Sequence, residues 1–75
     1  MNYRKMTDSF LAVAQKGTTY QIHEYTEMVD ATDPGQPPLE GMRSYETIEG
    51  DIVNPISNSE FVVFTGLDEV HVWRA

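Results

Sequence analysis

The side chains that most often carry chemistry are few in this sequence. Its two histidines, His23 and His71, are far apart and fit no His-x-His or His-x-x-x-His spacing. In a strand, His23 and its neighbour Glu24 point to opposite faces, so they do not share a metal ion. The chain has no cysteine, which excludes a disulfide framework, a thiolate zinc site and a cysteine nucleophile. We therefore expect no metal and no cofactor.

Nucleophilic and acid–base catalysis have equally little support. No serine stands in a Gly-x-Ser-x-Gly elbow, and the glycines are scattered rather than gathered in a phosphate-binding loop. Acidic pairs such as Glu46 and Glu49 occur, but a glycosidase needs two carboxylates that flank a substrate. A chain of 75 residues rarely forms such a cleft. We expect a protein that is not an enzyme.

Charge restricts the classes of partner. Twelve acidic residues against five basic ones give a net charge of −7, which opposes binding to nucleic acid and to anionic membranes. The apolar run at residues 10–14 is too short for a signal peptide or a membrane helix. We therefore expect a cytoplasmic protein.

An acidic, tyrosine-bearing segment is the most suggestive feature of the chain. Long-range attraction to such a face would speed the encounter with a basic partner protein. The simpler interpretation is a solvated strand end whose charges prevent edge-to-edge aggregation. The candidate partner-binding residues are Tyr20, Glu24, Tyr25, Glu27 and Asp30.

Turn-type clusters divide the second half of the chain into short β-prone runs at 42–48, 52–56, 60–65 and 70–74. This spacing predicts an antiparallel meander over residues 42–74. Four consecutive apolar residues from Phe61 to Phe64 predict a central strand covered on both faces, with Phe64 in the core. Pro55 lacks an N–H, which predicts an edge strand or a bulge. We place Trp73 in the core, with a dimer interface as the alternative.

The first half allows two interpretations. Residues 7–16 fit a short helix that begins at Thr7 or Ser9 and ends at Gly17, or a strand that turns back into the β-prone residues 19–22. We favour a hairpin over residues 9–31, because a helix of about ten residues is marginal. A change of apolar phase predicts a bulge or bend near Glu24. A Pro/Gly loop at 33–41 joins the hairpin to the meander.

Together these elements predict one all-β domain over residues 1–75. Its expected form is a small, partly open antiparallel barrel of the SH3-like kind, with five or six short strands and a possible short N-terminal helix. Curling gives so short a sheet an interior, whereas a flat sheet would leave one face in water.

The strand and turn residues also resemble those of a set of short uncharacterised bacterial proteins. The resemblance is carried by Thr19-Tyr20-x-Ile22, Leu39-x-Gly41, Gly50-x-x-Val53-Asn54-x-Ile56 and Thr65-Gly66. It implies a bacterial origin and an all-β domain, and it assigns no activity to any residue. We therefore expect a non-catalytic protein-interaction module with an acidic face. The alternatives are a homodimer whose interface completes a thin core and, more remotely, a barrel that binds a small ligand or a metal.

Overall fold

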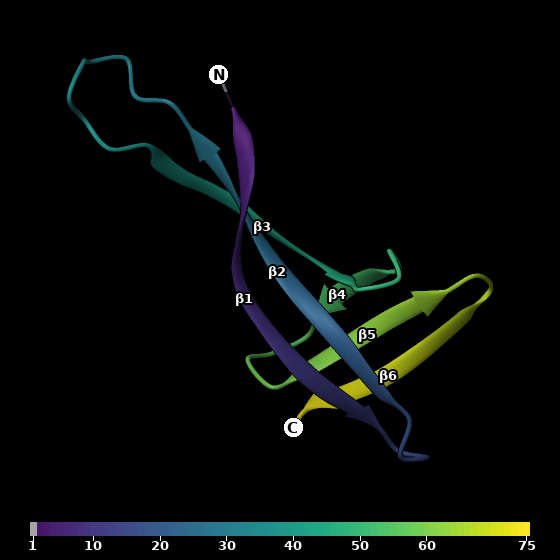
Figure 1. The fold of residues 1–75 in the computed structure, drawn as a ribbon. Coiled ribbons are helices and arrows are strands. Elements are labelled where there is room, and N and C mark those ends of the chain that lie inside the picture. The colour runs from purple at the N-terminus through teal and green to yellow at the C-terminus, as the bar shows by residue number, and fades with distance from the viewer. Residues whose placement is uncertain (1) are drawn as a thin grey trace.

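The computed structural model describes residues 2–75, which form six antiparallel strands (Figure 1). Each strand pairs with the next along the chain, and β1 pairs with β6, so that the sheet closes into a barrel. The prediction of a small all-β antiparallel barrel is confirmed. The barrel is closed rather than partly open, because Ala12 to Ala14 pair with Val72 to Arg74. The strands are β1 Tyr3–Ala14, β2 Thr19–Val29, β3 Leu39–Thr47, β4 Ile52–Pro55, β5 Glu60–Thr65 and β6 Asp68–Arg74.

Residues 7–14 are part of β1, so the helical alternative for 7–16 is wrong. The chain turns at Gly17, whose φ of 93° suits glycine, and returns as β2. Strand β3 begins at Leu39, inside the segment expected to be loop, because Leu39 and Glu40 pair with Val29 and Met28. The irregular segment thus ends after Pro38, where backbone N–H donors become available again.

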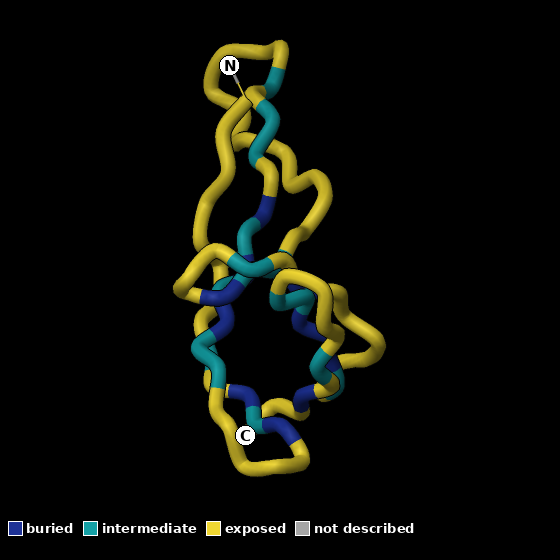
Figure 2. The backbone as a smooth tube through the Cα atoms, turned by 90° about the vertical axis from the view of Figure 1, so that its right-hand side faces the viewer, coloured by how far each residue is buried: buried dark blue, intermediate teal, exposed yellow. Residues whose placement is uncertain are grey.

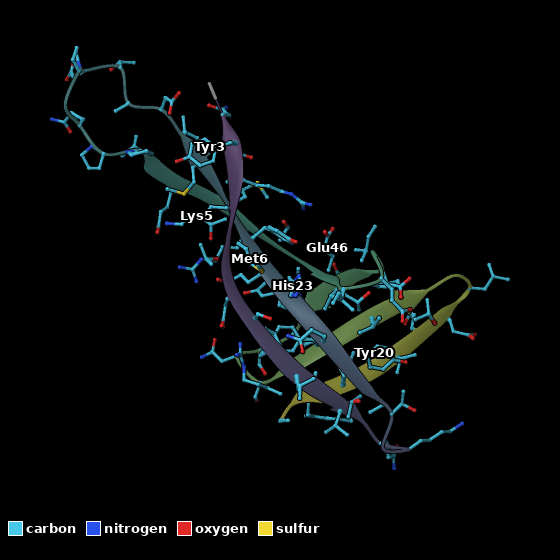
Figure 3. All side chains as sticks on the ribbon, in the orientation of Figure 1. Tyr3, Lys5, Met6, Tyr20, His23 and Glu46 are labelled. Atoms are coloured by element: carbon cyan, nitrogen blue, oxygen red, sulfur yellow. The ribbon has the colours of Figure 1, made fainter. Side chains whose placement is uncertain are left out.

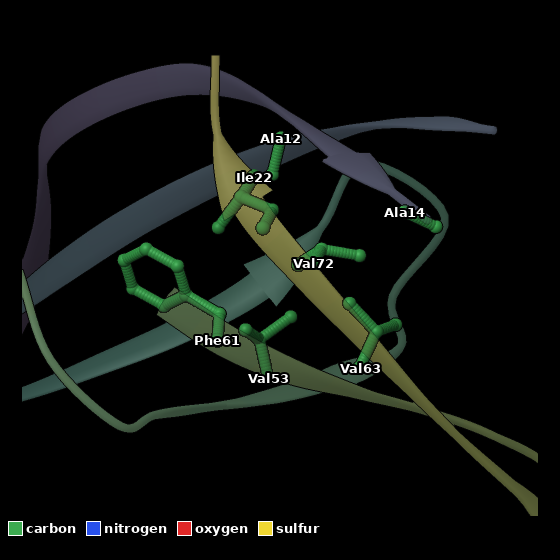
Figure 4. Packing of buried hydrophobic residues seen from close by; sticks show 7 residues of the cluster. All are labelled: Ala12, Ala14, Ile22, Val53, Phe61, Val63 and Val72. Carbon is green, nitrogen blue, oxygen red and sulfur yellow. The ribbon is translucent and has the colours of Figure 1, made fainter. Parts of the chain in front are cut away.

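The barrel interior is filled by inward side chains of β1, β2, β4, β5 and β6 (Figure 4), against which Tyr45 of β3 packs. Phe61 is its largest buried residue, at 1 % exposure. The Phe61 ring lies 5.1 Å from that of Phe10 and 5.4 Å from that of Tyr45, measured between centroids. The buried cluster comprises Ala12, Ala14, Ile22, Val53, Phe61, Val63 and Val72.

Several expectations about the core need correction. The expected cover on both faces of β5 is confirmed for residues 61–63, but Phe64 is only half-buried. Trp73 is 40 % exposed because Val72, its neighbour in β6, points inward instead. Pro55 is not on an edge strand, since β4 lies between β3 and β5; it ends β4 opposite Phe61, where the ladder stops.

Strands β1 to β3 continue well past the barrel (Figure 1). We call this extension the arm, formed by residues 3–6, 25–29 and 39–44 with the loop 30–38. It gives the molecule extents of 50 × 23 × 18 Å. Buried residues are concentrated in the barrel, whereas most of the arm is exposed (Figure 2). The arm therefore contributes surface rather than core.

Candidate functional site

The five residues proposed from sequence as a binding face do not form one surface. Residues of a strand alternate between its two faces, and the even-numbered positions of β2 point into the barrel. Tyr20 lies at the end of β2 near the β1–β2 turn, far from Tyr3 and Met6 on the arm (Figure 3). The remaining candidates are placed as follows: Glu24 is buried, Tyr25 is half-buried on the opposite face, and Glu27 and Asp30 are exposed on the arm.

Tyr25 is covered by contacts within the chain. The Arg4 guanidinium lies 3.9 Å from the centroid of the Tyr25 ring and forms an ion pair with Glu46 at 3.1 Å. The His23 ring is nearly perpendicular to the Tyr25 ring, at 73°, with its centroid 6.2 Å away. These contacts occupy much of the aromatic surface that the sequence had offered to a partner.

Glu24 is the acceptor of a hydrogen-bond network inside the barrel. Strand β2 keeps a regular alternation of buried residues through Ile22, Glu24 and Thr26, so the bulge expected there is absent. The irregularity lies opposite, in β1, where Thr7 is the extra residue between Met6 and Asp8. The Thr7 hydroxyl donates to Glu24 Oε1 at 2.6 Å, and the Tyr45 hydroxyl donates to Oε2 at 2.8 Å. Because Thr7 has one proton to donate, the Thr26 hydroxyl 2.9 Å away donates to Thr7.

This network fixes the protonation of both titratable members. The hydrogen bond from Thr7 lowers the pKa of Glu24 below its usual 4.5, and it outweighs the opposing effect of burial. The hydroxyl of Tyr45 and the charge of Arg43 lower it further. Burial, followed by the nearby carboxylate, raises the pKa of Tyr45 above 10.0. At neutral pH Glu24 is therefore an anion and Tyr45 keeps its proton.

Glu24 faces an open pocket at the end of the barrel from which the arm leaves, which we call the barrel mouth. Its volume is about 740 Å³. Arg74 is held in its wall: it lies 3.7 Å from the Phe10 ring centroid, pairs with Asp8 at 3.3 Å and donates to the Asn58 carbonyl at 3.2 Å. The lining residues are Thr7, Asp8, Glu24, Arg43, Tyr45, Pro55, Ile56, Ser57, Asn58, Phe61 and Arg74.

Arg43 differs from Arg74 in having a free charged group. Its backbone pairs with Thr26, so its side chain shares the inward face of the sheet and lines the mouth. The guanidinium acts on Glu24 and Tyr45 through space. Within residues 2–75, however, it forms neither a hydrogen bond nor an ion pair.

The arm has two outer strand edges, which differ in how they are protected. Strand β3 pairs with β4 only at Tyr45 and Glu46, so its edge from Leu39 to Ser44 has no partner strand among residues 2–75. Strand β1 pairs with β6 only from Ala12 to Ala14, which leaves an edge over its first residues.

The β1 edge carries features that discourage pairing. Arg4 and Lys5 place positive charges on it, and the bulge at Thr7 interrupts it. The Ser9 N–H already donates to the Asp8 carboxylate at 2.8 Å. The β3 edge has an irregularity of its own between Glu40 and Arg43, but it also presents two apolar side chains, Leu39 and Met42, which are 63 % and 80 % exposed.

Neither a metal site nor a membrane helix emerges from the part of the chain that is described. No group of three His, Asp or Glu side chains gathers there. His71 contacts Glu60 at 3.7 Å on the outside of the barrel, far along the chain from His23. Among these residues there is also no helix of the length and apolarity needed to cross a bilayer.

Sequence reasoning missed the residues that build the barrel mouth: Thr7, Arg43, Tyr45 and Arg74. One signal was present, since Glu24 alternates with Ile22 and Thr26 and so falls on the inward face of β2. A carboxylate at an inward position needs donors around it. Comparison with protein-family models, curated proteins and solved structures gave no match to this chain.

Proposed function

We propose that this protein is a non-catalytic interaction module that binds an extended, basic segment of a partner protein. The observation that carries the proposal is the unpaired edge of β3 from Leu39 to Ser44. An added strand would satisfy the outward backbone groups of this edge, and the side chains of Leu39 and Met42 would contact alternate residues of the segment.

The charge near this edge favours a basic partner. Between Glu27 and Met42 the chain has four acidic residues and neither lysine nor arginine. The net charge of −7 adds long-range attraction to a cationic segment. Of the acidic residues proposed from sequence, Glu27 and Asp30 are exposed on the arm and support this proposal, whereas Glu24 lies inside the barrel.

A homodimer is the second candidate, and one observation on the barrel favours it. Trp73 pairs with Val13 on the outside of the sheet, and Leu11 lies two residues farther along the same face. Leu11 and Trp73 are 52 % and 40 % exposed, and a large aromatic beside aliphatic residues is typical of a protein interface. The molar mass in solution separates this candidate from the first.

The test uses a soluble peptide of alternating Thr and Lys residues and its Thr/Glu counterpart. We expect the basic peptide to bind, as measured by fluorescence anisotropy, and to slow amide hydrogen exchange from Leu39 to Ser44. Met42→Lys should weaken this binding by placing a positive charge on the β3 edge, where it repels the lysines of the peptide. Leu67→Lys adds the same charge at the fully exposed β5–β6 turn and should leave binding nearly unchanged.

Equal weakening by the two variants would contradict strand addition at β3, because the effect would then come from net charge alone. Failure of both peptides to protect residues 39–44 would contradict it as well. A concentration-dependent mass of about two chains, lost on Trp73→Ala, would favour the homodimer.

A further inference from the structure

We propose that the barrel mouth binds a small zwitterion, a molecule that carries both an ammonium and a carboxylate group, as free amino acids do. This site is separate from the β3 edge, and the inference does not depend on strand addition. It rests on the arrangement of charges in the mouth and on the apolar residues at its rim.

The mouth contains two groups of each sign, and only one group of each sign is fully engaged. Arg74 and Asp8 neutralise each other in an ion pair, and Arg74 is also fixed by Phe10 and Asn58. Glu24 and Arg43 interact through space without forming an ion pair. The Glu24 carboxylate and the Arg43 guanidinium therefore face the same pocket, and both can form further hydrogen bonds with a ligand.

Glu24 is built to receive an ammonium group. Its two oxygens accept one hydrogen bond each, from Thr7 and Tyr45, and a carboxylate oxygen can accept a second. Those two donors hold the carboxylate in place before any ligand arrives, which reduces the ordering cost of binding. Arg43 offers a planar fork of N–H donors that suits a carboxylate.

Ligands of a single charge fit less well. A simple anion would approach Arg43 but would be repelled by Glu24 and Asp8, which line the same pocket. A simple cation would be repelled by Arg43 and Arg74 for the same reason. A zwitterion satisfies both free groups and adds no net charge to a molecule that already carries −7.

The rim indicates what the rest of the ligand should be. Pro55, the last residue of β4, and Ile56, which follows it, border the mouth, and Ile56 is 53 % exposed. The Phe61 ring lies below them in the core. An apolar side chain on the zwitterion would cover these groups, so we expect a preference for leucine over glycine.

The experiment compares three molecules that differ only in charge: L-leucine, 4-methylpentanoate, which lacks the ammonium, and 3-methylbutylamine, which lacks the carboxylate. Titrations are followed by the NMR signals of Thr7, Arg43 and Tyr45. Leucine should shift all three, and each analogue should bind about 10- to 100-fold more weakly, the factor expected for one lost charge-assisted hydrogen bond.

The variants assign the two contacts. Arg43→Gln should bind leucine and the amine equally well, and Glu24→Gln should bind leucine and 4-methylpentanoate equally well. Lys16→Gln removes the same charge as Arg43→Gln at the opposite end of the barrel and should leave leucine binding unchanged. Because Arg43 is exposed, its variant is expected to fold even if the Glu24 variant does not.

The proposal is overturned if no ligand shifts the mouth signals at millimolar concentration, or if a singly charged analogue binds the wild type as tightly as leucine. It is also overturned if Lys16→Gln weakens leucine binding as much as Arg43→Gln does. None of these results bears on peptide binding at β3, so the two proposals can fail separately.

Discussion

Replacing Phe61 with alanine should be the most damaging single truncation in this protein. The side chain is 1 % exposed and packs its ring against those of Phe10 and Tyr45. Removing a buried phenylalanine costs about 3–5 kcal/mol, from lost burial and the cavity left behind. A chain of 75 residues has a total stability of about 4–11 kcal/mol. The Phe61→Ala variant should therefore lose from about a quarter of its stability to all of it.

Phe64→Ala is the matched comparison, because it makes the same chemical change in the same strand at a half-buried position. We expect it to cost roughly 1–2 kcal/mol, since much less apolar surface is removed from water. Urea unfolding followed by circular dichroism measures both values, and Phe61→Leu extends the series if the alanine variant does not fold. A cost for Phe64→Ala equal to or above that of Phe61→Ala would refute the assignment of Phe61 to the core.

Three further predictions concern the network, the barrel exterior and the arm. Tyr45→Phe should cost about 1.5–3 kcal/mol at neutral pH, because Glu24 loses a donor. Because the pKa of Glu24 is lowered in the folded state, the Glu24 carboxylate stabilises the fold above its usual pKa of 4.5, and this stabilisation is lost as the pH falls through the lower folded pKa. Urea unfolding over a series of pH values checks this, and a cost of Tyr45→Phe that is the same at every pH would contradict it. Trp73→Ala should cost about 2–3 kcal/mol in a monomer, less than Phe61→Ala, as thermal melting at low concentration can check. Glu27→Lys should change stability by no more than about 0.5 kcal/mol while weakening binding of the Thr/Lys peptide, and a larger stability loss would show that Glu27 has a structural role.

The sequence was sufficient for the last three strands of the barrel, β4 to β6. Turn residues such as Gly50 and Gly66, both with positive φ, separate β-prone runs, and the observed strands from β4 to β6 follow that division closely. The ambiguous residues 7–16 needed tertiary information, because their local pattern fits both a helix and a strand. Pairing with β2 and β6 decided for the strand.

Which individual side chains point into the core was harder to predict from the sequence. Phe61 and Phe64 are the same residue type in one apolar run, and only the curvature of the closed sheet decides which one points inward. Trp73 was expected inside because it is large, but Val72 points inward, and alternation along β6 therefore places Trp73 on the exterior. Residue size predicts how much burial could be gained, whereas register decides whether it is gained.

The features of the candidate sites also divide into those that the sequence determined and those that the tertiary structure decided. The sequence by itself determined the acidic charge, the absence of cysteine and the alternation that places Glu24 beside Ile22 and Thr26 on the inward face. Only the tertiary structure brought Thr7 and Tyr45 to Glu24, across sequence separations of 17 and 21 residues, and left Arg43 facing it. Such contacts depend on strand order, on the bulge at Thr7 and on barrel closure. These arise from pairing between distant segments, which local residue preferences do not encode.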